Sequence, residues 1–172
     1  EICKLIYVMY NVKLSCEKKN PRKVRSKNQN YFGFKKVKKY LSKMGWNVIL
    51  STFPENVLDF DDKIIKINNR CRHSTKLICL LHEIGHILLA RKKYYNYLYP
   101  AGCIEYNKSI RRKCDRINIL QEESAAWDIA LLLAKSLKIK IDLDKFSKIR
   151  SSSLLSYARW ADKNPKYGNS YL

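Results

Sequence analysis

The stretch "LLHEIGHILLA", residues 80–90, sets His82 and His86 four positions apart and places Glu83 directly after the first histidine. On an α-helix this spacing brings both imidazole rings to one face, a turn apart, as two ligands of one zinc ion require. Glu83 lies one residue further round the helix, where its carboxylate can reach a water beside the metal without ligating the metal. The stretch therefore predicts a helix that carries an H-E-x-x-H metal site.

The residues around this stretch predict that the helix is buried. We expect Ser74 to cap its N-terminus, and the apolar side comprises Leu77, Leu80, Leu81, Ile84 and Leu88. Gly85 is less favourable in a helix than alanine by about 1 kcal/mol, so its presence indicates close approach by another segment. The alternative interpretation is two core histidines that hydrogen-bond to backbone groups. Unpaired histidines would be costly to bury in such a helix, which favours the metal site.

A catalytic zinc ion needs a third protein ligand and one open position. His73 is the only other histidine, and it precedes the motif by more than two helical turns. A carboxylate from the segment "EESAAWDIALLLA" (122–134) is the better candidate. Glu123 shares a helical face with Ala126 and Ala130, whose small side chains would let this helix pack closely against the histidine helix. We expect Glu123 to be the third ligand and Glu122 to face another direction.

Other interpretations of these residues remain open. Glu122 and Glu123 could both be solvated charges in the first turn of a helix, where the macrodipole favours acids. Cys79 lies three residues before His82, and Cys71 and His73 form a short metal-like pair. We interpret Cys79 as a packing residue and the Cys71–His73 pair as a coincidence.

These motifs carry a resemblance. "LLHEIGHILL", followed 37 positions after His86 by E-x-x-A-x-x-x-A, resembles the ImmA/IrrE-type metallopeptidases, which are small gluzincin-like zinc proteases of bacteria and phages. The segment "IIKINNRCRHSTKLICLL" (64–81) is similar to the strand, turn and lead-in helix before the family motif, so that the likeness covers about residues 46–135. Ile129 stands where the family often has phenylalanine. Many members carry a DNA-binding domain or act on a helix-turn-helix repressor, and we expect no such domain within these 172 residues.

The resemblance implies a zincin-like domain in which a short N-terminal sheet precedes the H-E-x-x-H helix and a glutamate-bearing helix. It implies His82, His86 and Glu123 as zinc ligands, Glu83 as the catalytic base and Ala126 as a helix-contact residue. The function expected is a zinc-dependent endopeptidase that cuts a protein substrate, with the attacking water activated by Glu83. His73 or a tyrosine within residues 94–106 is expected to stabilise the oxyanion.

The rest of the chain predicts an α+β fold in a single domain over residues 1–172, because strands come early and helices late. Strands are expected at 2–14, 46–50 and 61–69, and a helix at 34–44 that Gly45 ends. A capping box of Asn118 and Gln121 predicts a helix over about 119–138. Asp142 and then Ser152 or Ser153 are expected to cap two short helices after it.

The net charge of +20 is the strongest compositional feature, and residues 18–43 hold many lysines and arginines without an acid between Lys18 and Lys43. Such a segment attracts nucleic acid or an acidic protein surface. Within it, the polar stretch 16–30 is expected to be an exposed, mobile loop. The alternative function is a basic nucleic-acid-associated or virion-associated protein, phage or viral in origin, in which the zinc site is only structural.

Apolar runs such as Leu77–Leu81 fall far short of the roughly 20 residues that a membrane span needs, so no membrane partner is expected. The segment "EICKLIYVMY" (1–10) lacks the features of a secretion signal. The six cysteines include no C-x-x-C pair and are expected to be reduced thiols. The expected location is therefore cytoplasmic.

Overall fold

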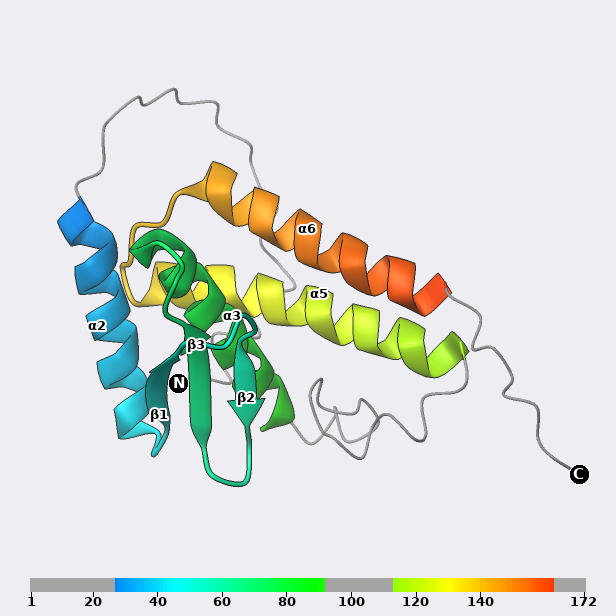
Figure 1. Ribbon diagram of the computed structural model, residues 1–172, viewed down its shortest axis with the longest axis horizontal. Coiled ribbons are helices and arrows are strands. Elements are labelled where there is room, and N and C mark those ends of the chain that lie inside the picture. The colour runs from blue at the N-terminus through cyan, green and yellow to red at the C-terminus, as the bar shows by residue number, and fades with distance from the viewer. Residues whose placement is uncertain (1–26, 92–112, 163–172) are drawn as a thin grey trace, which may run out of the picture.

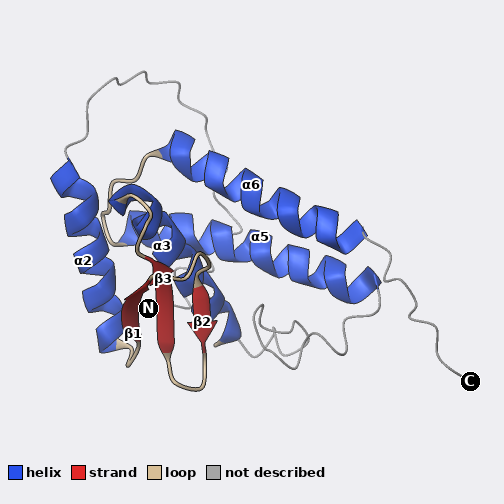
Figure 2. Cartoon of the chain, in the orientation of Figure 1, coloured by secondary structure: helices blue, strands red, loops and turns tan. Residues whose placement is uncertain are grey.

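The computed structural model describes residues 27–91 and 113–162 (Figure 1). In chain order the elements are α2 (Lys27–Lys43), β1 (Asn47–Ser51), β2 (Val57–Asp59), β3 (Ile64–Asn68), α3 (His73–Ala90), α5 (Lys113–Ser136) and α6 (Leu143–Asp162). Figure 2 shows one small sheet with helices around it. This confirms the α+β class.

The sheet has the strand order β1-β3-β2. β1 runs parallel to β3, from the pair Asn47↔Ile64 to the pair Ser51↔Asn68, and β2 runs antiparallel to β3. The sheet's buried side chains join the core around α3 and are Val48, Leu58, Ile65 and Ile67. The strand expected at 61–69 begins only at Ile64, because the chain turns at Lys63 with a φ of 53°. β2 was not predicted, since three residues are too few for a periodic signal.

α2 lies beside both β1 and α3. It begins at Lys27, seven residues before the predicted start, so residues 27–30, which were expected to belong to a loop, are helical. Gly33 lets the helix lie close against α3. A Cβ at Gly33 would stand 2.9 Å from Leu77 Cδ2. The predicted end is confirmed. Gly45 has a φ of 78°, and the amide of Trp46 donates to the carbonyl of Leu41 in a Schellman motif.

α3 is the central helix, in contact with α2, β3 and α5. The predicted apolar side is confirmed, because Leu77, Leu80, Leu81, Ile84 and Leu88 are all buried. The predicted N-cap is wrong. Arg72 occupies the cap position without a side-chain cap bond, and Ser74 lies inside the first turn. There the Ser74 hydroxyl accepts a hydrogen bond of 2.6 Å from Lys145 Nζ. Its side chain therefore contacts another segment instead of capping the helix.

α5 and α6 pack against each other, and α5 also packs against α3 (Figure 1). α5 begins at Lys113, so Asn118 and Gln121 lie within the helix and the predicted capping box is wrong. The first turns of α5 contact α6, since the Arg116 guanidinium donates to the carbonyl oxygen of Trp160 over 3.3 Å.

The region after α5 is a single helix rather than two short ones. Asp142 caps α6 as predicted, because its Oδ1 accepts a hydrogen bond from the amide of Lys145 at 3.0 Å. Ser152 and Ser153 lie inside the helix, so neither is a cap.

Three predictions lie outside the described residues: the strand at 2–14, most of the loop at 16–30 and the tyrosine-rich segment 94–106. Within the part that is described, no helix is both long and apolar enough to cross a membrane.

Candidate metal centre

The site forms where α3 and α5 come unusually close together. A Cβ built on Gly85 would collide with the carbonyl oxygen of Ala126 and would stand 2.9 Å from its Cα. Ala126 and Ala130 are fully buried. The predicted close approach is therefore confirmed, and it follows from hydrogen or methyl side chains on both helices. Any larger side chain at Gly85 would push α5 away from the two histidines.

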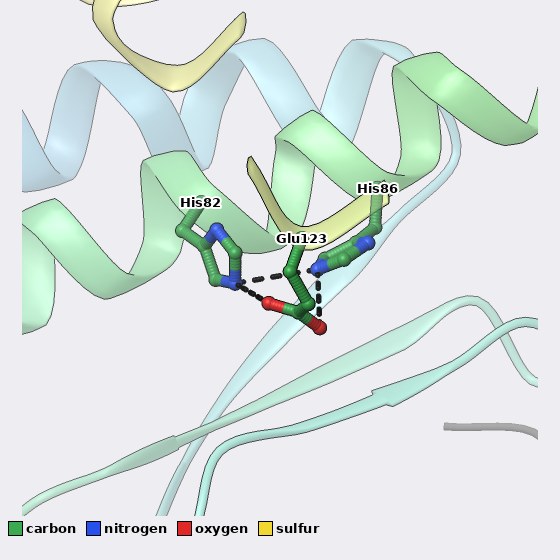
Figure 3. A group of neighbouring side chains, drawn as sticks. All are labelled: His82, His86 and Glu123. Carbon is green, nitrogen blue, oxygen red and sulfur yellow. Dashed lines mark hydrogen bonds and ion pairs between the residues drawn. The ribbon is translucent and has the colours of Figure 1, made fainter. Parts of the chain in front are cut away.

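The three predicted ligand side chains converge across this contact (Figure 3). His82 Nε2 and His86 Nε2 are 3.2 Å apart. Glu123 reaches in from α5, with Oε2 3.2 Å from His82 Nε2 and Oε1 3.5 Å from His86 Nε2. His82, His86 and Glu123 are 8%, 3% and 1% exposed, so three polar side chains meet inside the core. Among the described residues, they form the group of potential ligands close enough to hold a metal ion.

The spacing of these atoms is of the size that a shared metal ion needs. Bonds of about 2.0–2.1 Å at tetrahedral angles separate neighbouring ligand atoms by about 3.3 Å. The two Nε2 atoms are 3.2 Å apart, and each lies 3.2–3.5 Å from a different oxygen of the Glu123 carboxylate. In addition, Glu123 Oε2 is buried without a hydrogen-bond partner of good geometry. Two imidazoles and one carboxylate therefore lie close enough together to hold a metal ion.

Glu122 also belongs to this site, contrary to expectation. We expected it to face another direction, yet it is 4% exposed and its Oε1 lies 3.3 Å from His86 Nδ1. Because α5 starts well before residue 119, neither glutamate is a solvated charge of a first turn. Both acids instead face α3.

Trp127 is a further neighbour that sequence reasoning missed. Its ring stacks on that of His82, with centroids 4.0 Å apart and an interplanar angle of 16°. The available signal was its position four residues after Glu123, which puts it one turn further along the same side of α5.

Tyr157 reaches the site from α6, a helix to which the sequence analysis assigned no role. Burial and the negative charge of the nearby Glu123 carboxylate raise the pKa of its phenol, which places the Tyr157 side chain beside this candidate ligand. No pattern near residue 157 could have shown this, because the contact joins segments 34 residues apart. His73, in contrast, is exposed at the start of α3 and lies against Tyr31. It is not part of the site.

The protonation of the ligands follows from their burial and pairing. Burial disfavours the charged form of His86, but hydrogen bonds to Glu122 and Glu123 outweigh it and raise the pKa to about 10. Burial also disfavours ionised Glu123, whereas hydrogen bonds to His82 and His86 bring its pKa down to about 2. The two carboxylates thus favour the protonated form of His86, and the two histidines favour the ionised form of Glu123.

Glu83 is the acid that follows the first ligand. Burial raises its pKa above the ordinary value, the two histidines oppose that rise, and Glu123 adds to it. These electrostatic neighbours are the candidate ligands themselves, so Glu83 stands beside the three candidate ligands without being one of them.

The cysteine predictions are consistent with the site geometry. Cys71 and Cys79 form no disulfide. Cys79 packs against the core, and burial raises the pKa of its thiol to about 11. Neither thiol belongs to the group of potential ligands among the described residues.

Comparisons of the chain with protein-family models, with curated proteins and with solved structures found no match.

Proposed function

We propose that this chain is a zincin-like, zinc-dependent endopeptidase that makes selective cuts in a protein substrate, and that it belongs with the ImmA/IrrE-type metallopeptidases. The observation that carries the proposal is the convergence of His82, His86 and Glu123, whose nitrogen and oxygen atoms lie 3.2–3.5 Å apart, with Glu83 next to them. Two imidazoles and one carboxylate are the donor set of several zinc peptidases.

The roles of the residues follow from their positions. His82, His86 and Glu123 would hold the ion, which when bound would supply a Lewis acid that polarises a water and a peptide carbonyl. Glu83 would accept the proton of the attacking water at its carboxylate and return it to the leaving amine. Burial raises the pKa of Glu83 above its ordinary value, and this direction favours a group that returns the proton it has taken.

The metal site is tested by metal analysis of the purified protein. We expect one zinc ion per chain in the wild type, and its loss in His82→Ala and in Glu123→Ala. His73→Ala is the matched control, since it removes the histidine outside the candidate site and should leave the zinc content unchanged. Zinc that persists in both ligand variants would overturn the site.

The peptidase activity is tested with Glu83→Gln, which keeps the size of the side chain. We expect this variant to hold zinc as tightly as the wild type and to cut no substrate. Comparing new protein N-termini in cells that express the wild type or Glu83→Gln identifies the substrate. An identical set of N-termini in the two samples would contradict the proposal.

A second candidate function is nucleic-acid binding, and the outer face of α2 favours it. This face carries no acid, and its exposed lysines are Lys35, Lys36, Lys38, Lys39 and Lys43. Exposed Tyr31 and Phe32 lie at its N-terminal end, and Lys35 Nζ lies 4.6 Å from the Tyr31 ring centroid. Lysines beside aromatic rings suit phosphates and stacked bases. In this alternative the zinc would be purely structural.

Salt dependence tests the second candidate. Binding to a single-stranded oligonucleotide should weaken steeply with salt, and Lys35→Ala with Lys39→Ala should lower the log–log slope by about 1.4 for two lost phosphate contacts. The control pair Lys148→Ala with Arg159→Ala removes the same charge from exposed positions on α6. Equal slopes for the two pairs would contradict a specific role of α2.

A further inference from the structure

Both histidines of the candidate metal centre contact side chains of α5, but the contact to each histidine is of a different kind. This inference rests on the proposed metal site, but it does not depend on peptidase activity. An imidazole ring binds a metal well only when one nitrogen presents a lone pair in the correct direction.

His86 is held through its outer nitrogen. Its Nδ1 lies 3.3 Å from Glu122 Oε1, while its Nε2 faces His82 Nε2 at 3.2 Å. A carboxylate at Nδ1 favours the tautomer in which Nδ1 carries the hydrogen, and this leaves a lone pair on Nε2. Glu122 lies on the opposite side of the ring from the other candidate ligands, so it can orient the ring without being a ligand.

His82 has no such acceptor. Its Nδ1 is buried, and the described part of the chain provides no hydrogen-bond partner for it. Its ring instead stacks on Trp127, with a centroid separation of 4.0 Å and an interplanar angle of 16°. Trp127 is only 2% exposed, and Phe146 of α6 packs edge-on against it at 5.4 Å. The ring of His82 thus lies nearly parallel to an indole that is itself buried and packed.

We propose that Glu122 and Trp127 are positioning residues of the metal centre, with Glu122 fixing His86 and Trp127 fixing His82. Together with the ligand Glu123 they occupy one side of α5, where the contact between Ala126 and Gly85 brings that side against α3. The two adjacent glutamates therefore have different roles: one is a ligand and the other orients a ligand.

The Glu122 role is tested by measuring the zinc dissociation constant by competition with a chelating indicator. Glu122→Ala should weaken zinc binding roughly 10- to 100-fold, as is usual for loss of a partner of a ligating histidine. Glu122→Gln should bind more tightly than Glu122→Ala, because the amide oxygen can still accept from Nδ1. Gln121→Ala, at the exposed neighbouring position, is the control and should match the wild type.

The Trp127 role is tested by comparing Trp127→Phe with Trp127→Leu. Phenylalanine keeps an aromatic face and should bind zinc nearly as well as the wild type, whereas leucine should weaken binding roughly 2- to 10-fold. Trp46→Leu is the matched control, because it removes a buried tryptophan that packs on Phe60 rather than on a ligand. It should lower stability while leaving the zinc constant unchanged.

Cobalt absorption provides a second readout that a general loss of stability would not change. Four-coordinate Co²⁺ should give the same visible spectrum in the wild type and in the controls, and an altered spectrum in Glu122→Ala and Trp127→Leu. Wild-type zinc constants and spectra in both variants would overturn the inference. Complete loss of metal in Glu122→Ala, equal to that in Glu123→Ala, would also overturn it by making Glu122 a ligand.

Metal analysis and cleavage assays of the wild type distinguish the metal site from the peptidase activity. A wild-type protein that binds no zinc overturns the metal site itself. A wild-type protein that binds zinc but cuts nothing overturns the peptidase, whereas the roles of Glu122 and Trp127 remain measurable.

Discussion

At the scale of single residues, the candidate site pairs the imidazole of His86 with the carboxylate of Glu123. His86 has a folded-state pKa of about 10, above its ordinary 6.5, so its pairing stabilises the metal-free protein fully below about pH 6.5 and is lost as pH rises through 10. Glu123 has a pKa of about 2, below its ordinary 4.5, so its pairing acts above pH 4.5 and is lost as pH falls through 2. Both contributions are complete only in weakly acidic solution.

This pairing predicts the proton balance of metal binding. Near neutral pH, zinc should displace the proton of His86 and none from Glu123, so that about one proton is released per ion. Calorimetry in two buffers of different ionisation enthalpy measures that number, and the apparent zinc affinity should rise with pH up to about 10. Binding without proton release would show that His86 is already neutral in the metal-free protein.

At the scale of secondary-structure elements, the site depends on the spacing of α3 and α5 and on the attachment of α6 to α5. Gly85 and Ala126 set the first of these distances. Arg150 of α6 supports the second, through contacts of 2.9 Å with Asp128 Oδ1 and 3.4 Å with Ser124 Oγ. Changes at these contacts should therefore act on metal binding without touching a ligand.

Gly85→Ala should destabilise the protein by about 1–3 kcal/mol through overpacking, and it should also weaken zinc binding because α5 must move away from α3. Gly45→Ala is the control. It places a side chain at a φ of 78°, which costs about 1–2 kcal/mol, in a turn with open space around it. Denaturant unfolding and zinc titration of both variants check this. Wild-type zinc affinity in Gly85→Ala would contradict the role assigned to helix spacing.

Tyr157→Phe should weaken zinc binding by roughly tenfold, because the hydroxyl that lies near Glu123 from α6 is removed while the ring stays. Tyr40→Phe is the matched control, since this partly buried tyrosine packs against the core from α2. Zinc titration of the two variants is the measurement. An equal effect of both changes would indicate that Tyr157 has only a packing role.

At the scale of the whole molecule, the candidate ligands come from two helices that lie far apart in the sequence. The unfolded chain does not bring them together, so metal binding should favour the folded state. Zinc at about 100 times its dissociation constant should add about 2.7 kcal/mol, which raises the melting temperature by about 5–10 °C for a chain of this size. Calorimetry with and without a chelator measures the shift. His82→Ala should abolish the rise and His73→Ala should retain it.

The sequence by itself determined the local features. Histidines four residues apart on an apolar helix must share a face, since the helical repeat decides this. The glycine after α2 and the aspartate before α6 have side chains suited to ending and starting a helix, and both act as predicted. Glu123 was preferred to Glu122 because of the small residues spaced after it, and the structure brings Glu123 to both histidines.

Only the tertiary structure decided the rest. Four features depend on contacts between residues that are distant along the chain. They are the early start of α5, the burial of Glu122, the stacking of Trp127 on His82 and the contact of Tyr157 with Glu123. Local propensity cannot encode such contacts, because they depend on how closely α3, α5 and α6 pack. That packing places a side chain from another helix against each of the three candidate ligands, and it brings the carboxylate of Glu123 to the two histidines of the helical motif.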